Sequence, residues 1–96
     1  MQLFFSEGAQ QELDDAFNWL EQEQAGLGYR FTADVDEALK RIRQQPHAWH
    51  QLGATLRRCL LKHFRYGLIY RIHSEQIEIL AVAHTSRQPD YWQNRV

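Results

Sequence analysis

Two histidines, an arginine and a tyrosine in the second half of the chain have the side-chain types that acid–base chemistry on a phosphate requires. Cleavage of a phosphodiester by a neighbouring hydroxyl needs a proton acceptor, cationic donors on the phosphoryl oxygens and an acid for the leaving oxygen. The candidates for these roles are His63, His84, Arg87 and Tyr91. The alternative interpretation is structural, with His84 hydrogen-bonded at a strand end and His63 exposed to solvent.

A metal centre and a reactive thiol are not expected. His47 and His50 form a His-x-x-His pair, but no cysteine or acidic residue accompanies them, so the pair lacks the ligands of a zinc site. Cys59 is the single cysteine and lies in an apolar run, which predicts a buried small hydrophobic side chain. We therefore predict no cofactor.

Other basic and aromatic residues suit binding, because Arg and Trp dominate the energetics of protein interfaces. The candidates for contacting a target are Arg57, Arg58, Arg87, Tyr91, Trp92 and Arg95. If Arg57 and Arg58 lie on a strand they point to opposite faces, so only one can serve an exposed site. We expect the other to pair with a carboxylate of the first half. Trp92 could equally fold back onto the sheet as a lid.

The elements that must position these residues begin with a strand and two helices. The apolar start, residues 1–5, suits a strand, and Ser6 is a candidate N-cap for a helix that ends near Gly26. A second helix follows through residues 31–42 and is closed by Pro46, so that the two form a hairpin. The acidic residues of its first half, Asp34 among them, are interpreted as a solvated face that matches the helix dipole.

After Gly53 the hydrophobic period changes from helical to alternating. Residues 56–61, 64–72 and 77–84 are rich in branched and aromatic side chains and predict three sequential strands. Residues 47–53 are expected to form a loop with Trp49 against the core. Tyr66 and Tyr70 share a strand face and suit the core. The tail is irregular at Pro89, with a short helix expected from residue 90.

These elements predict an α+β fold formed by one domain, residues 1–96. An N-terminal strand and a helical hairpin precede a three-stranded antiparallel β-meander, with the helices packed on one face of the sheet. No apolar run is long enough to span a bilayer, and the first residues lack the basic start and apolar core of a signal peptide. We therefore expect a cytoplasmic protein with no membrane partner.

The charge is divided unevenly along the chain. Residues 1–50 carry four basic and nine acidic side chains, whereas residues 51–96 carry seven basic and three acidic ones. A basic half can steer the chain towards an acidic partner. The excess is smaller than that of a typical nucleic-acid-binding domain, so we expect no sequence-specific nucleic-acid binding by this chain alone.

Several motifs of the chain occur together in one order. They are a basic pair entering a strand (Leu56-Arg57-Arg58), a Phe-x-Tyr-x-x-x-Tyr strand (Phe64, Tyr66, Tyr70), an Ile-x-Ile-Leu-Ala-Val-x-His strand (Ile77 to His84) and an Arg-x-Pro-x-Tyr-Trp ending (Arg87 to Trp92). The helical hairpin with its Gly-Leu-Gly turn and following Phe, residues 26–31, fits the same pattern. Over nearly its whole length the chain thus resembles the ParE/RelE toxin superfamily.

The resemblance implies the toxin of a type II toxin-antitoxin system, associated with growth arrest and plasmid stabilisation. A ParD-like antitoxin would hold it inactive by wrapping it with an extended, partly helical C-terminal segment. Trp19 and Tyr29, which lie off the apolar stripes of the hairpin, are the candidates for binding it. Docking of a helix in a groove and addition of a strand to the sheet edge both remain open.

Two branches of the superfamily differ in their chemistry. RelE-like members are ribosome-dependent mRNA endonucleases that hold the phosphate with basic residues and a Tyr, whereas ParE-like members are associated with inhibition of DNA gyrase. Gly67 follows Tyr66 where RelE-like nucleases often carry an Arg, and a pI near 6.5 disfavours docking on ribosomal RNA. The ending from Arg87 to Trp92 also looks more like the ParE side.

The sequence therefore predicts a non-enzymatic inhibitor of DNA gyrase that a cognate antitoxin neutralises. One alternative is a RelE-like ribosome-dependent RNase, in which Arg87 and Tyr91 would converge with a basic groove. Another is a non-toxic homologue that only binds antitoxin. The alternatives differ in whether DNA synthesis, protein synthesis or neither stops first when the chain is expressed alone.

Overall fold

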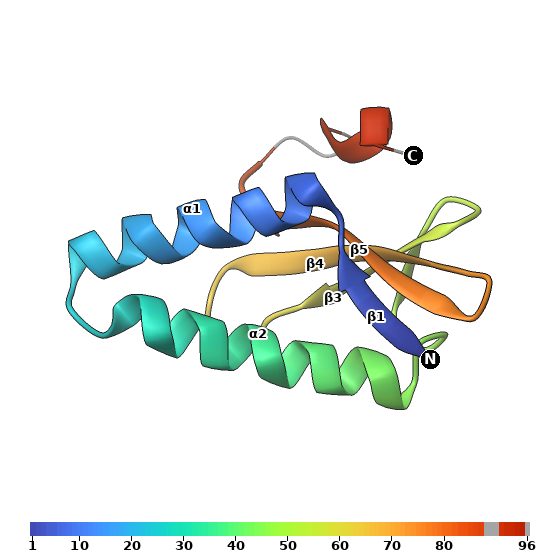
Figure 1. The fold of residues 1–96 in the computed structure, drawn as a ribbon, viewed down its shortest axis with the longest axis horizontal. Coiled ribbons are helices and arrows are strands. Elements are labelled where there is room, and N and C mark those ends of the chain that lie inside the picture. Colours follow the sequence, from blue (N-terminus) through green and yellow to red (C-terminus); the bar gives the residue numbers. More distant parts are fainter. Residues whose placement is uncertain (88–90, 96) are drawn as a thin grey trace.

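Two long antiparallel helices follow a short first strand, and both lie on one side of a sheet (Figure 1). The computed structural model describes residues 1–87 and 91–95, so the predictions made for Pro89 and residue 90 lie outside the described residues. Helix α1 spans Glu7–Glu23 and helix α2 spans Leu27–Gln44. The hairpin predicted from the apolar spacing is confirmed.

The ends of the helices are fixed by side chains that satisfy free backbone amides. Ser6 caps α1 as predicted, and its hydroxyl accepts a hydrogen bond from the Ala9 amide at 3.1 Å. At the turn, the carboxylate of Glu21 accepts hydrogen bonds from the amides of Gly26 and Gly28 at 2.8 and 2.9 Å. Gly26 has a φ of +90°, in the left-handed region that favours glycine. The turn therefore depends on one acid and one glycine.

The sheet has five strands in the order β1-β5-β4-β3-β2. Their bounds are Gln2–Phe5 (β1), His50–Leu52 (β2), Leu56–Leu60 (β3), Tyr66–His73 (β4) and Gln76–His84 (β5). The predicted meander is confirmed as β3, β4 and β5, which pair antiparallel. Strand β1 pairs parallel to β5, so the sheet is mixed. The α+β class with helices on one face holds.

One predicted loop is wrong in part. The segment 47–53 contains β2, which pairs antiparallel with β3 and forms the sheet edge. A strand of three residues is too short to show an alternating pattern, so no signal in the sequence marks it. Trp49 is half-buried, and its indole nitrogen donates a hydrogen bond to the Arg41 carbonyl at 3.3 Å, so its predicted place beside the core is confirmed.

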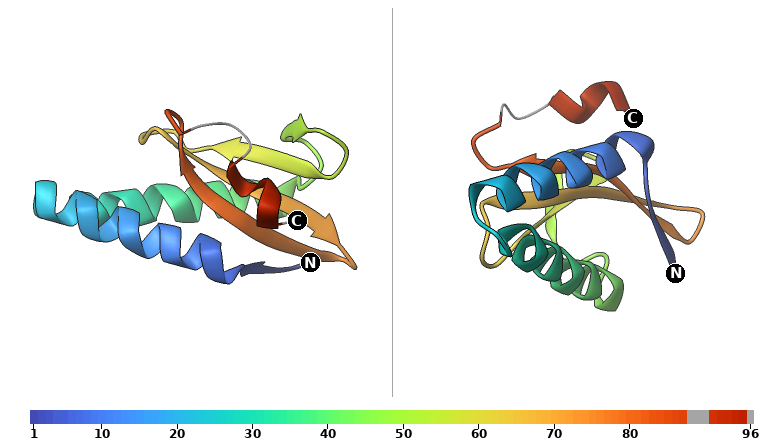
Figure 2. Two further views of the ribbon diagram at one scale, coloured as in Figure 1. Left: turned by 90° about the horizontal axis from the view of Figure 1, so that it is seen from above. Right: turned by 60° about the vertical axis from the view of Figure 1, so that its left-hand side comes forward.

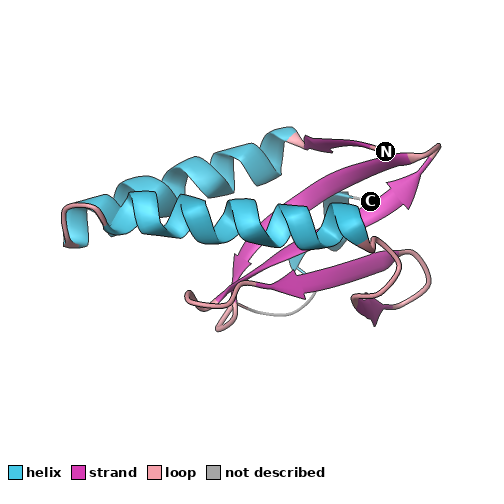
Figure 3. Ribbon diagram, turned by 90° about the horizontal axis from the view of Figure 1, so that it is seen from below, coloured by secondary structure: helices cyan, strands magenta, loops and turns pink. Residues whose placement is uncertain are grey.

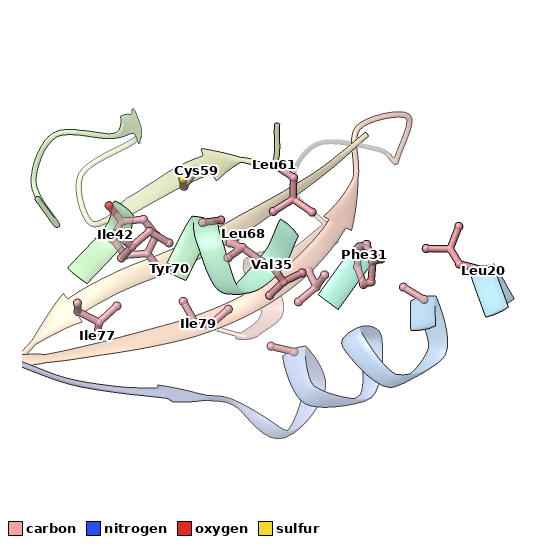
Figure 4. Close-up of a cluster of buried hydrophobic side chains, with 14 residues drawn as sticks. Leu20, Phe31, Val35, Ile42, Cys59, Leu61, Leu68, Tyr70, Ile77 and Ile79 are labelled. Carbon is pink, nitrogen blue, oxygen red and sulfur yellow. The ribbon is translucent and has the colours of Figure 1, made fainter. Parts of the chain in front are cut away.

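The helices cover one face of the sheet (Figure 3), and the main core fills the space between them and the sheet (Figure 4). Its largest side chains come from α2, β4 and β5, and Cys59 is fully buried among them, as predicted. Tyr66 and Tyr70 face the same layer, which also confirms the expectation. A bulge in the β4–β5 pairing turns both Leu80 and Ala81 to the opposite face of the sheet.

That opposite face carries a second, smaller apolar cluster beneath a short 3-10 helix, η1, Tyr91–Arg95 (Figure 2). Trp92 packs there with Leu56, Ile69, Leu80 and Ala81 and is 8% exposed. Both faces of the sheet are thus covered in part. Within the described residues, no helix is long and apolar enough to cross a membrane.

The buried Tyr70 makes the free energy of unfolding depend on pH in the alkaline range. Its hydroxyl donates to the Pro46 carbonyl at 2.5 Å, and burial raises the pKa of Tyr70 from 10.0 to about 12. The unfolded chain ionises first, so this stabilisation is complete below pH 10 and is lost as the pH rises towards 12. We expect the free energy of unfolding to fall by about 2–3 kcal/mol over that interval.

Urea unfolding at a series of pH values measures this loss. Tyr70→Phe should remove most of Tyr70's contribution to the alkaline decline and, through the lost hydrogen bond, cost about 1 kcal/mol at neutral pH. Tyr29→Phe is the matched control, because the Tyr29 side chain is exposed. An unchanged alkaline decline in Tyr70→Phe would show that other groups govern it.

Candidate functional site

The end of the chain is held against α1 by a single carboxylate. Glu12 accepts hydrogen bonds from Tyr91 Oη at 2.6 Å and from Arg95 Nη1 at 2.8 Å. Its Oε1 also accepts the Val82 backbone amide at 2.9 Å, which joins the same carboxylate to β5. The Glu12 side chain is 14% exposed, so these bonds form largely away from water. We call residues 91–95 the C-terminal strap.

Two of the predicted target contacts, Trp92 and Arg95, lie in the strap and make contacts within the chain. Trp92 is packed on the sheet, which corresponds to the lid interpretation, and Arg95 is used in the ion pair with Glu12. Arg95 also lies 5.2 Å from the centre of the Tyr91 ring. In this conformation Tyr91, Trp92 and Arg95 hold the strap in place, and Trp92 is almost fully buried.

A small hollow of about 80 Å³ beside the strap gathers the remaining polar candidates. Arg58, His84, Thr85 and Arg87 line it. The Arg87 guanidinium stacks on the Tyr91 ring at 4.0 Å, and Arg58 Nε is buried without a hydrogen-bond partner among the described residues. Two guanidinium groups at one hollow can hold a carboxylate or a phosphate.

The four residues considered for phosphodiester cleavage do not form one proton-transfer site. His63 lines a different hollow, beside α2. Burial, the hydrogen bond to Glu12 and the charge of Glu12 all raise the pKa of Tyr91, so its phenol is held protonated by an internal acceptor. His84 is engaged through Nδ1 with Ser86 Oγ at 2.7 Å, consistent with a structural role. The arrangement suits anion binding better than acid–base catalysis.

A larger groove, about 780 Å³, lies between α2 and the loop after β3. Its base is fixed by Asp34, which is 4% exposed and accepts the backbone amides of Lys62, His63 and Phe64 at 3.4, 2.8 and 3.1 Å. The prediction that Asp34 belongs to a solvated helix face is wrong. The loop approaches α2 closely enough to replace solvent around this carboxylate.

Comparison with known proteins agrees with this architecture. The sequence model of the family described as "ParE toxin of type II toxin-antitoxin system, parDE" matches residues 3–89. The chain belongs to this ParE toxin family. A solved chain from the "Chromosomal ParDE TA system from P. aeruginosa" has the same fold, with a TM-score of 0.78 at 18% identity over 88% of this chain and 95% of that one.

Two curated relatives, both named Toxin ParE2, come from Mycobacterium tuberculosis strains CDC 1551 and H37Rv. Each is 43% identical to this chain over 56 residues, which is 58% of this chain and 53% of the relative. The aligned part thus spans about half the length of the curated relatives it matches.

In this ParE family member the predicted basic pair divides between the two faces of the sheet. Arg58 lines the hollow, whereas Arg57 lies on the helix side and its Nη1 donates to the Trp49 carbonyl at 2.9 Å. The expectation that one of the pair binds a carboxylate of the first half is wrong within the described residues, because β2 brings this carbonyl next to Arg57 instead.

The aromatic residues predicted to bind an antitoxin lie exposed on the hairpin of this ParE toxin. Trp19 on α1 is 60% exposed and Tyr29 on α2 is 66% exposed. The Tyr29 ring meets Phe17 edge to face, with 5.0 Å between centroids, so it has a defined position. Large aromatic side chains left open to water suit a protein interface.

Sequence reasoning missed the two acids on which these surfaces depend, Glu12 and Asp34. Each lies on a helix face that also carries solvated charges, and their partners come from segments far along the chain. A signal for Glu12 was present, since it lies three positions after Ala9 and four before Ala16, which are both buried in the core. Asp34 has the same spacing from Phe31 and Ala38, but its partners are backbone amides of a distant loop, which no side-chain pattern marks.

Proposed function

We propose that this chain is a toxin that inhibits DNA gyrase without catalysing a reaction of its own, and that a cognate ParD-like antitoxin neutralises it. Membership of the ParE toxin family supports the toxin assignment. In this proposal the chain acts in the cytoplasm. The free toxin arrests growth, and the toxin together with its antitoxin stabilises a plasmid.

One observation carries the non-enzymatic part of the proposal. Tyr91 is the phenol that an RNase of this superfamily would need near the phosphate. Its hydroxyl instead donates a hydrogen bond to Glu12 at 2.6 Å, and burial together with this bond raises the pKa of Tyr91. Gly67 lines the hollow where a further arginine would strengthen a phosphate clamp. A surface that only binds an anionic group and stabilises a complex needs neither a free phenol nor this further arginine.

We propose that the target contacts the surface around Arg58 and Arg87, and that the strap supports it from behind. Arg57 on the other face is then excluded from the contact, and Tyr91, Trp92 and Arg95 act by holding the strap. Trp19 and Tyr29 remain the proposed aromatic contacts for the antitoxin, on a separate part of the molecule.

Inhibition of supercoiling by purified gyrase tests the target surface. We expect the wild-type chain to inhibit, and Arg58→Ala together with Arg87→Ala to weaken inhibition about tenfold or more, as for central residues of an interface. Arg65→Ala, an exposed arginine in the loop after β3, is the matched control and should inhibit like the wild type.

Incorporation of labelled thymidine and methionine after induction of the chain alone separates the alternatives. DNA synthesis should stop first. Protein synthesis stopping first, with mRNA cleavage that Arg87→Ala abolishes, would replace gyrase inhibition with a RelE-like nuclease. If neither stops, the chain is an antitoxin-binding homologue without toxicity.

A further inference from the structure

The hollow beside the strap has a floor of very small residues. Gly67 on β4 pairs with Leu60 on β3 and with Ala83 on β5, so a glycine and an alanine lie side by side in the sheet. Ile69 and Trp92 also line the hollow, which has a volume of about 80 Å³. Pockets that enclose small-molecule ligands begin at about 300 Å³. The hollow therefore suits one small chemical group of a larger partner.

Gly67 also makes room for the side chain of Arg58. A Cβ atom at position 67 would lie 3.3 and 3.4 Å from Cγ and Cδ of Arg58, so the stem of this arginine passes close to the glycine. Arg58 Nε is buried and has no hydrogen-bond partner among the described residues. Buried polar groups of folded proteins nearly always have a partner. This N–H therefore marks a place for an acceptor that the described part of the chain does not supply.

The second guanidinium at the hollow, that of Arg87, is held by stacking. Its central carbon lies 4.0 Å from the centre of the Tyr91 ring, and the Tyr91 hydroxyl is fixed by its hydrogen bond to Glu12. Stacking uses the flat face of a guanidinium and leaves the N–H groups at its edge for an anion. The strap thus positions a cationic donor without taking up its hydrogen-bonding edge.

Neutral donors complete the lining. The Ser86 amide donates to Nδ1 of His84 at 3.0 Å, which places the hydrogen of the neutral imidazole on Nε2 and leaves Nε2 as a donor. Thr85 adds a hydroxyl, and the lining residues that the structure describes include no Asp or Glu. The hollow therefore has a positive charge that its own lining does not compensate, which favours an anion.

The placement of the donors favours a phosphate over a carboxylate. Arg58 belongs to β3, His84 to the end of β5, and Arg87 follows β5. A carboxylate has two oxygens in one plane and suits a single bidentate guanidinium, whereas the oxygens of a phosphate are arranged tetrahedrally and can accept from several sides. A phosphate group therefore satisfies donors that come from separate segments.

We propose that this hollow holds one phosphodiester group of the DNA on which gyrase acts, with Arg58 and Arg87 as its charged donors and Gly67 as the residue that positions Arg58. The inference rests on the proposed function and names the chemical group that the target surface contacts. Proteins that bind DNA by charge alone contact many phosphates. A single phosphate contact therefore strengthens binding only when gyrase holds both the DNA and the toxin.

Arginine Nε–H signals in NMR spectra of the full chain test the site itself. The probes are dimethyl phosphate, which is a phosphodiester with one negative charge, acetate and inorganic phosphate, all at the same ionic strength. We expect the Arg58 and Arg87 signals to shift with saturation at millimolar dimethyl phosphate, and acetate to bind about threefold or more weakly. The signal of Arg43, an exposed arginine on α2, should not saturate. Gly67→Ala displaces the Arg58 stem and should weaken binding of dimethyl phosphate.

Binding to gyrase with and without DNA tests the assignment to DNA. Dissociation constants of the full chain are measured for gyrase alone and for gyrase loaded with a DNA duplex. We expect the wild type to bind the loaded enzyme about tenfold or more tightly, and Arg58→Gln to bring the ratio of the two constants close to one. The logarithm of the wild-type ratio should fall with the logarithm of the salt concentration with a slope of about −0.9, the value for one phosphate contact. Arg43→Gln, outside the hollow, should keep the wild-type ratio.

The other outcomes overturn the proposal in distinguishable ways. A wild-type ratio near one, with both constants weakened equally by Arg58→Gln, would place a carboxylate of gyrase at the hollow while the proposed function stands. Acetate binding as tightly as dimethyl phosphate would give the same answer in the NMR titration. Saturation of the Arg58 signal by micromolar inorganic phosphate would make the hollow a site for free phosphate. If the wild type binds gyrase neither with nor without DNA, the proposed target falls together with this inference.

Discussion

Glu12→Ala is expected to release the C-terminal strap from the sheet and to lower the free energy of unfolding by about 2–4 kcal/mol. The substitution removes the shared acceptor of the Tyr91 hydroxyl, the Arg95 guanidinium and the Val82 amide. Arg95 is only partly buried, so its loss of a partner costs less than that of a fully enclosed charge. Most of the effect comes from the unsatisfied amide and from the exposure of Trp92.

Two measurements detect release of the C-terminal strap in Glu12→Ala. Urea unfolding gives the loss of stability, and hydrogen exchange followed by mass spectrometry reports the opening of η1 and of β5 around Val82 under native conditions. We expect faster exchange in both segments well below the unfolding transition. Gyrase inhibition should fall in parallel, if the strap supports the surface around Arg58 and Arg87 as proposed.

Glu78→Gln is the matched control for Glu12→Ala. Glu78 has the same 14% exposure and also pairs with an arginine, Arg71, at 2.9 Å, but at the β4–β5 hairpin and away from the strap. It should cost some stability and leave exchange in η1 unchanged. If Glu12→Ala leaves the exchange of η1 at the wild-type rate, the carboxylate does not anchor the strap.

The parts of this fold that the sequence predicted are those governed by neighbours along the chain. Ser6 caps α1, the two helices pair, and three strands form a meander because capping, apolar spacing and turn residues act over a few positions. The burial of Cys59 and the opposite orientation of Arg57 and Arg58 follow from the same local pattern.

The parts that could not be predicted depend on contacts between distant segments. The parallel pairing of β1 with β5 joins residues more than seventy positions apart, and no local pattern fixes its direction. Glu12 meets Arg95 across 83 positions, and Asp34 meets the loop of residues 62–64 across about thirty. The candidate site depends on these long-range contacts. Several of its residues could therefore be predicted from their types, but the two carboxylates that position it, Glu12 and Asp34, could not.

Asp34→Ala is expected to destabilise the chain by about 3 kcal/mol, because three buried backbone amides lose their acceptor at once. The carboxylate is 4% exposed, so water cannot replace it without opening the loop. The effect should extend to the groove, since residues 62–64 form the wall opposite α2. Urea unfolding measures the first effect, and hydrogen exchange of the amides of residues 62–64 measures the second.

The design of the variants separates the hydrogen bonds from the charge. Asp34→Asn keeps one acceptor oxygen and turns an amide group towards the other donors, so it should lie between the wild type and Asp34→Ala in stability. Asp36→Ala, an exposed acid two positions along α2, removes the same charge without a structural partner and should change stability by less than about 0.5 kcal/mol. Equal losses in Asp34→Ala and Asp36→Ala would mean that the helix charge matters and the loop contacts do not. A loss confined to position 34, with faster amide exchange of residues 62–64 in the still-folded Asp34→Asn, would tie the geometry of the groove to this one carboxylate.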